Sequence, residues 1–156
     1  MKTTSLILLL FLWLELNKSP AIIIMKDVPI DIEFSKENLK AYIKEIGLLY
    51  PKVVLAQARI ETGNFTSTIF KENNNLFGMK FPRQRETTAI DINRNHSVYE
   101  NWKKSVDDYK LWQCNMIHRI SSKEEYLSYL GRNYAKDKKY VSRLRQIIWK
   151  LDSQEE

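Results

Sequence analysis

The feature that most constrains the fold is an apolar segment that starts at Pro51 and ends at Glu61. Its sequence, PKVVLAQARIE, is apolar nearly all the way round a helix, which is typical of a helix buried on most of its sides. Proline suits the first position of a helix, and Gly63 suits its end. Because such a helix must be surrounded by other elements, the chain is expected to fold as a helical domain.

Helix signals occur on both sides of this segment. Ser35 and Asp137 stand where helix N-caps are expected. Ser105 and Ser122 each open a capping-box sequence. Together with the apolar spacing, these signals predict helices over residues 35–46, 51–61, 67–72, 105–120, 122–133 and 137–151.

Between residues 77 and 102 the helical spacing disappears. This stretch contains β-branched and aromatic residues of the kind found in strands, at Thr87, Thr88, Ile90, Ile92, Val98 and Tyr99. They predict a small β-hairpin or irregular lobe. The expected fold class is therefore mostly α (α+β), in one domain, since 156 residues are a usual length for one domain.

Composition excludes several classes of site. Cys114 is the single cysteine, so an internal disulfide is ruled out. His96 and His118 have no Cys or His neighbour at ligand spacing, which excludes zinc-finger and HExxH sites. The four glycines are isolated, so no glycine-rich phosphate loop can form. Neither a metal nor an organic cofactor is expected.

The net charge of +6, from 25 basic and 19 acidic residues, favours anionic partners. Nucleic acid, an anionic membrane surface and an acidic cell-wall polymer all fit, and a merely soluble basic surface fits as well. The sequence has no helix-turn-helix or RNA-binding signature, so nucleic acid is not an expected partner.

Residues 1–20 have the features of an export signal. A lysine is followed by an apolar run from Leu6 to Leu14, which is short for a membrane span and has the size of a signal-peptide core. A signal peptide or N-terminal anchor is predicted, which places the protein in the periplasm, the cell envelope or the medium. An N-terminal core helix is the alternative.

Glu61 is the outstanding candidate for chemistry, because it ends the most apolar helix of the chain. Apolar surroundings and the negative C-terminal end of a helix both disfavour a charged carboxylate and raise its pKa. A glutamic acid that stays protonated near neutral pH is what a general acid needs. Gln57 lies one turn earlier on the same face and can hydrogen-bond it. The alternative is an ordinary glutamate at an exposed helix end.

Two further segments carry groups suited to a sugar. The segment NNLFGMK, residues 74–80, offers asparagine amides for acetamido and hydroxyl groups, and Gly78 allows close backbone approach. On its own this segment is also typical of an Asn-rich turn. In YAKDKKY, residues 134–140, Tyr134 falls between helices, where its ring can pack against a sugar. Tyr140 is expected in the core.

In this order the segments resemble the glucosaminidase-type peptidoglycan hydrolases of glycoside hydrolase family 73, which include the domain of flagellar rod-assembly muralytic enzymes. The matching stretches are VLAQARIETG, NNLFGMK, SVYENWKKSV and YAKDKKY. The resemblance implies a lysozyme-like, mostly α domain over residues 34–151, with a cleft flanked by the small β-hairpin lobe. It also implies cleavage of the β-1,4 bond after N-acetylglucosamine in peptidoglycan.

The resemblance also assigns site residues. The catalytic glutamate of the family falls on Glu61, and substrate-binding positions fall on Tyr134, Asn75, Phe77, Gly78 and Gln57. Many relatives place a second carboxylate in a longer β-lobe, whereas here Glu86 and Asp91 are the acidic candidates in a short one. The mechanism, whether retaining, inverting or substrate-assisted, therefore stays open.

The sequence predicts an exported peptidoglycan hydrolase, expected as a monomer, that binds glycan strands and protonates the leaving oxygen through Glu61. A lytic transglycosylase that uses the same glutamate and forms an anhydro-sugar is one alternative. A cell-wall-binding or assembly module without turnover is another. An uncleaved N-terminal membrane tether also stays open.

Overall fold

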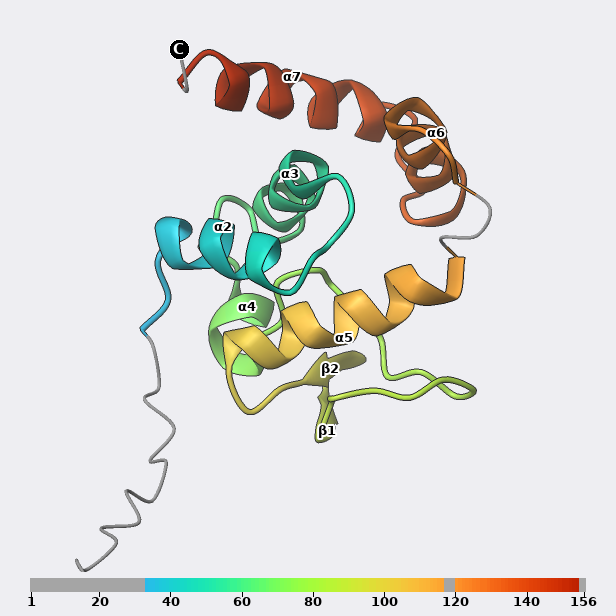
Figure 1. Ribbon diagram of the computed structural model, residues 1–156. Helices are drawn as coiled ribbons and strands as arrows, with labels where there is room; N and C mark the ends of the chain where they lie inside the picture. Colours follow the sequence, from blue (N-terminus) through green and yellow to red (C-terminus); the bar gives the residue numbers. More distant parts are fainter. Residues whose placement is uncertain (1–32, 117–119, 155–156) are drawn as a thin grey trace, which may run out of the picture. The chain divides into compact units, whose positions relative to one another are not determined.

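The computed structural model describes residues 33–116 and 120–154 (Figure 1). The predicted leader, residues 1–20, lies outside the described residues. The described helices are α2 (Lys36–Glu45), α3 (Pro51–Glu61), α4 (Thr68–Asn73), α5 (Trp102–Met116), α6 (Lys123–Asn133) and α7 (Tyr140–Asp152). Strands β1 (Asp91–Asn93) and β2 (His96–Val98) lie between α4 and α5. The predicted fold class, mostly α with a small β-hairpin, is confirmed.

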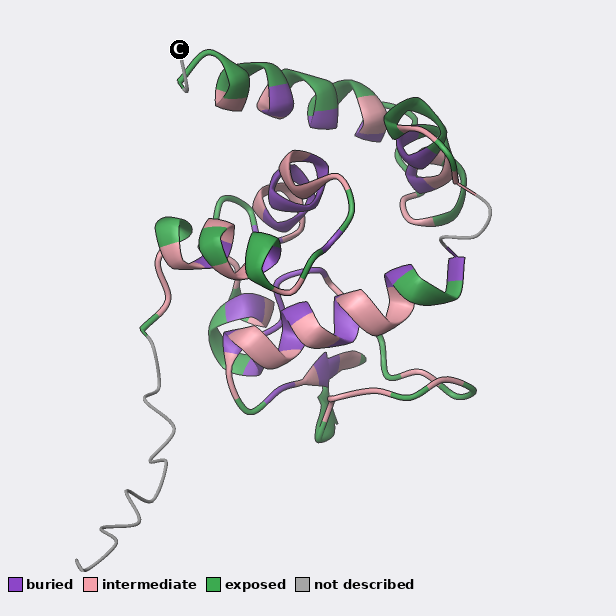
Figure 2. Cartoon of the chain, in the orientation of Figure 1, coloured by how far each residue is buried: buried purple, intermediate pink, exposed green. Residues whose placement is uncertain are grey.

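α3 is the central helix of the described chain, as its apolar sequence predicts. Val54, Leu55 and Ala58 belong to a core cluster with residues of α2, α4 and α5. Val53 and Ala56, on the other side of α3, belong to a second cluster with α6 and α7. Figure 2 shows this helix buried along most of its length. The two clusters explain why the helix is apolar nearly all round.

Two of the predicted N-caps are confirmed. The hydroxyl of Ser35 accepts from the backbone N–H of Asn38 at 2.9 Å, at the start of α2. The hydroxyl of Ser122 accepts from the backbone N–H of Glu125 at 3.2 Å, at the start of α6. Each serine satisfies a backbone donor that the first helical turn leaves without a partner.

The capping box predicted at Ser105 is wrong. α5 already begins at Trp102, so Ser105 lies inside the helix and its hydroxyl donates to the Trp102 carbonyl at 2.9 Å. The side chain of Asn101 instead accepts from the backbone N–H of Lys104 at 3.2 Å. Asparagine caps helices as well as serine does, so the local sequence offered two starts.

The cap predicted at Asp137 is also displaced. α7 begins at Tyr140, and Lys139 is its N-cap residue, without a side-chain cap bond. The carboxylate of Asp137 accepts from the backbone N–H of Lys139 at 2.8 Å, one position ahead of the helix. Asp137 therefore shapes the turn that leads into α7.

The β-hairpin is a tight one and is fixed to α4. Ile92 pairs with Ser97, and the turn residues Arg94 and Asn95 have φ of +51° and +59°. Two positive φ values in a row give the turn whose twist matches that of the strands. The amide of Asn93 donates to the side-chain oxygen of Asn73 in α4 at 2.8 Å.

The stretch that follows residue 80 is tied to α5 by Asp108, whose side chain is fully buried. Arg85 donates to both oxygens of this carboxylate, at 2.7 Å and 2.9 Å. Thr87 and Tyr99 donate to it at 2.6 Å and 2.7 Å. Three separate side chains thus hold the lobe against the helical core. In the described part of the chain, no helix is long and apolar enough to cross a bilayer.

Candidate active site

Glu61 is the last residue of α3, where the helix leaves the core. Its side chain is half-buried, and Oε1 accepts a hydrogen bond from the Tyr140 hydroxyl at 2.7 Å. The next residue, Thr62, is buried and donates its hydroxyl to the Ala58 carbonyl at 2.6 Å, which closes the helix end. The carboxylate is therefore held at a fixed point, partly open to solvent.

The pKa of Glu61 is raised from its ordinary value. Burial is the largest cause, because it disfavours the charged form. The hydrogen bond from Tyr140 and the positive charge of Arg143 act in the opposite direction and offset only part of the effect. The carboxyl group thus stays protonated to a higher pH than an exposed glutamate, as the sequence predicts.

The 75–78 loop passes directly beside Glu61. Gly78 has φ of +64°, and a Cβ atom built on it would lie 3.3 Å from Oε2 of Glu61. A glycine is favoured here both by the left-handed backbone and by the close approach. The loop backbone therefore stands next to the oxygen of Glu61 that Tyr140 does not contact.

Asn75 and Phe77 hold this loop in shape from the inside. The amide of Asn75 donates to the carbonyls of Met79 and Ser97, both at 2.9 Å. Its oxygen accepts from the backbone N–H groups of Phe77 and Met79 at 3.3 Å and 3.1 Å. Both N–H groups and both acceptor positions of this amide are in use. The ring of Phe77 is fully buried and lies 4.2 Å from the ring of Tyr109.

Tyr134 lies on the other side of the loop, at the end of α6. Its hydroxyl donates to the carbonyl of Phe77. Its ring packs edge-on against Trp112 at 5.3 Å and stacks with Tyr140 at 6.4 Å. Burial and the nearby charge of Glu61 raise the pKa of Tyr134, so its hydroxyl remains a proton donor in this bond. The structure thus brings Glu61, the 75–78 loop and Tyr134 together.

Gln57 is fully buried and reaches Glu61 only through another residue. Its Nε2 donates to the Tyr140 hydroxyl at 3.2 Å, and that hydroxyl contacts Glu61. The direct hydrogen bond expected between Gln57 and Glu61 is therefore replaced by a bridge through Tyr140. Sequence reasoning missed this role of Tyr140, since its spacing on α7 indicated only a core position.

Glu86 and Asp91 are both exposed residues of the lobe. Asp91 accepts from the backbone N–H of Ile92 at 2.7 Å. Within the described chain, neither is a hydrogen-bond partner of Glu61. The same part of the chain contains no group of three His, Cys, Asp or Glu side chains able to hold a metal ion.

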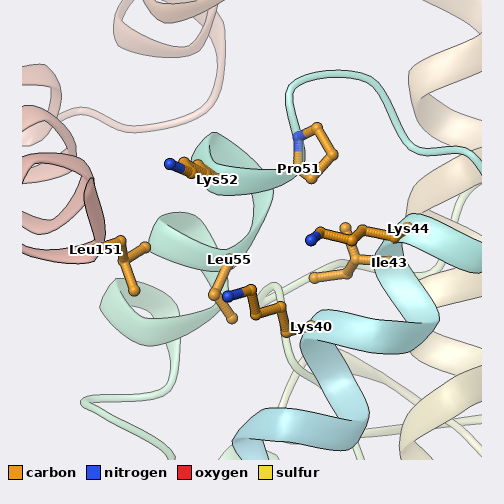
Figure 3. A pocket seen from close by; sticks show the side chains of 7 residues that line it. All are labelled: Lys40, Ile43, Lys44, Pro51, Lys52, Leu55 and Leu151. Atoms are coloured by element: carbon orange, nitrogen blue, oxygen red, sulfur yellow. The ribbon is translucent and has the colours of Figure 1, made fainter. Parts of the chain in front are cut away.

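A pocket shown in Figure 3 lies apart from these residues, between α2, α3 and the end of α7. It is lined by Lys40, Ile43, Lys44, Pro51, Lys52, Leu55 and Leu151. None of the predicted site residues lines it, so it contributes nothing to the chemistry of Glu61.

Replacing Gly78 with alanine is expected to impair activity as well as stability. The left-handed backbone alone costs a residue with a Cβ about 1–2 kcal/mol, and the new methyl group would press on Glu61. The matched control is Gly47→Ala, at nearly the same φ of +66°, where the Cβ would meet only Lys110. Thermal unfolding is expected to show similar losses of stability in both variants. Only Gly78→Ala is expected to lose more activity than its loss of stability explains. Equal activity in the two would contradict the prediction.

Comparison with known proteins gives two findings. The family model of glucosaminidase, described as mannosyl-glycoprotein endo-beta-N-acetylglucosaminidase, matches residues 36–153. Among solved structures, the chain is similar to the catalytic domain of the autolysin Auto from Listeria monocytogenes, at 22% sequence identity and a TM-score of 0.49. That match covers 75% of this chain and 80% of the other. No curated protein matches.

Proposed function

The chain belongs to the glucosaminidase family and is a glycoside hydrolase, and from this premise we propose that it cleaves the β-1,4 bond after N-acetylglucosamine in peptidoglycan, with Glu61 as general acid. The observation that carries the proposal is the half-buried carboxyl of Glu61, whose raised pKa suits a proton donor. In the reaction, Glu61 transfers its proton to the leaving oxygen as the glycosidic bond breaks. Water or another nucleophile then forms a new bond to the sugar carbon that the leaving oxygen occupied.

The neighbours of Glu61 supply positioning. Tyr134 and Asn75 hold the loop from both sides, which keeps Gly78 beside the carboxyl group of Glu61. We assign the sugar to the side of Glu61 that this loop borders, with the exposed part of Tyr134 as its aromatic contact. Asn75, Phe77 and Gln57 act on the sugar indirectly, since their side chains are buried.

The structure constrains the second catalytic group, a base or a nucleophile, less than it constrains the acid. Glu86 and Asp91 are the carboxylates that the lobe offers, and both are exposed. A separation of about 5–5.5 Å between two carboxyl groups would suit retention, and about 6.5–9.5 Å would suit inversion. Attack by the acetamido group of the sugar itself would need no carboxylate as nucleophile.

Product analysis tests the proposal. Digestion of purified peptidoglycan is expected to release fragments whose reducing end is N-acetylglucosamine, as read by mass spectrometry. An anhydromuramic end would instead support the lytic transglycosylase alternative. Binding to the cell wall without any released product would support a non-catalytic module. Either result would overturn the proposed reaction.

The substrate also bears on where the protein acts. Peptidoglycan lies outside the cytoplasmic membrane, so a hydrolase of it acts in the cell envelope or the medium. This fits the signal peptide or anchor that residues 1–20 predict. We propose that the protein acts there as a monomer on glycan strands.

A further inference from the structure

A row of buried polar side chains leads from the backbone of Leu49 to the carboxylate of Glu61. Its members, each at most 2% exposed, are Gln113, Tyr126, Tyr109, Gln57 and Tyr140. Burying polar groups is costly unless each is hydrogen-bonded, and Phe or Leu would fill the same space without that cost. These polar side chains therefore serve through their hydrogen bonds rather than through packing.

The backbone fixes the direction of the row at its start. The N–H of Leu49 donates to Oε1 of Gln113 at 2.8 Å, and Nε2 of Gln113 donates to the Leu49 carbonyl at 3.1 Å. A backbone N–H can only donate and a carbonyl can only accept, so the amide of Gln113 cannot be turned round. Its second N–H donates to the Tyr126 hydroxyl at 3.0 Å.

The direction passes from Tyr126 to Gln57. The Tyr126 hydroxyl accepts from Gln113, and it donates to the Tyr109 hydroxyl because the single proton of Tyr109 is used elsewhere. Tyr109 in turn donates to Oε1 of Gln57. Because Oε1 of Gln57 accepts, Nε2 points the other way and donates to the Tyr140 hydroxyl at 3.2 Å.

Tyr140 ends the row at Glu61. Its oxygen accepts from Gln57, so its proton goes to Oε1 of Glu61 at 2.7 Å. Oε1 is thereby occupied as an acceptor, and the acidic proton of Glu61 belongs on Oε2. That oxygen faces Gly78, whose Cβ position lies 3.3 Å from it.

We infer that Tyr140 and Gln57 are positioning residues, which use a one-way row of hydrogen bonds to place the acidic proton of Glu61 on Oε2, beside the 75–78 loop. This inference rests on the proposed function, in which Glu61 is the acid. A reversed row would put the proton on Oε1, where it would point to Tyr140 and away from a sugar. The direction of the row thus determines which carboxyl oxygen of Glu61 carries the proton that is donated.

Three titratable or charged groups of the described residues act on Glu61 or are acted on by it. Tyr140 and Arg143 come from α7, and Tyr134 comes from the end of α6. Tyr140 and Arg143 both favour the carboxylate form of Glu61. Loss of the donor at residue 140, or weakening of that donor through residue 57, therefore raises the pKa of Glu61.

The test uses the full chain and three variants. Tyr140→Phe removes the hydroxyl that touches Glu61. Gln57→Met removes the donor to that hydroxyl and no group bonded to Glu61. The matched control, Tyr99→Phe, removes a buried hydroxyl from a different carboxylate, that of Asp108.

The pKa of Glu61 is measured in the resting protein by carbon-13 NMR of its carboxyl group. We expect Tyr140→Phe to raise it most, Gln57→Met to raise it less, and Tyr99→Phe to leave it unchanged. On purified peptidoglycan, the limb where activity falls as Glu61 loses its proton is expected to move to higher pH in the first two variants. Their kcat is expected to fall roughly tenfold or more, because the carboxyl group loses its fixed orientation.

Two results separate this inference from the proposed function. An unmoved pKa of Glu61 in either Tyr140→Phe or Gln57→Met would overturn the row, and Gln57→Met decides alone if Tyr140→Phe does not fold. A wild-type protein without lytic activity would overturn the proposed function instead. The titration needs no substrate, so it decides on the row in that case as well.

Discussion

Replacement of Glu61 with glutamine is expected to lower the rate of peptidoglycan cleavage about 10²–10⁴-fold, the usual contribution of a general acid. Glutamine has the same shape, and its Oε1 can still accept from the Tyr140 hydroxyl. Its amide cannot give a proton to the leaving oxygen. The measurement is the release of reducing ends from purified cell wall.

Glu100→Gln is the control for this variant, since it makes the same change of side chain at an exposed residue. It is expected to keep the wild-type rate, and circular dichroism should show both variants folded. Lysis by Glu61→Gln at the wild-type rate would show that another group donates the proton.

Glu61→Gln should also be at least as stable as the wild type at neutral pH. Burial raises the pKa of Glu61, so ionisation of this group costs more in the folded than in the unfolded chain. The contribution of Glu61 to the free energy of unfolding is complete below the pKa that it has in the unfolded chain. This contribution is lost as the pH rises through the higher pKa that Glu61 has in the folded chain. Urea unfolding at several pH values should therefore show the advantage of the variant at neutral pH disappearing in acid.

Replacement of Asp108 with asparagine is expected to lower the free energy of unfolding by about 3–5 kcal/mol, as when one partner of a buried ion pair is removed. Asp108 is fully buried, and the guanidinium of Arg85 that binds both its oxygens is 16% exposed. The variant leaves this cation without a counter-charge and weakens the bonds from Thr87 and Tyr99. Urea unfolding at neutral pH measures the loss.

The pH dependence of Asp108 has the opposite sign to that of Glu61. Burial alone would raise the pKa of Asp108, but hydrogen bonds from Arg85, Thr87 and Tyr99 outweigh it and lower the pKa. Its contribution is present above the unfolded pKa and is lost as the pH falls through the lowered folded value. The difference in free energy of unfolding between the wild type and Asp108→Asn should therefore become smaller at acidic pH. A variant as stable as Glu100→Gln at neutral pH would contradict this account.

The fold was predictable to the extent that it depends on local pattern. The apolar circumference of α3, the serine caps of α2 and α6, and the loss of helical spacing before α5 each follow from a few adjacent residues. The start of α5 was missed because Asn101 and Ser105 both suit an N-cap, and packing of Trp102 chooses between them. Where two local signals compete, tertiary contacts decide.

By itself, the sequence determined that a carboxyl group ends the most buried helix and that a glycine-containing loop and a tyrosine belong near it. Only the tertiary structure decided that Asn75 turns inward, and that Tyr140 and Gln57 give Glu61 its fixed partner. The physical reason is distance along the chain. Tyr109 bonds Gln57 across 52 positions and Gln57 bonds Tyr140 across 83, and no local spacing encodes the direction of such hydrogen bonds.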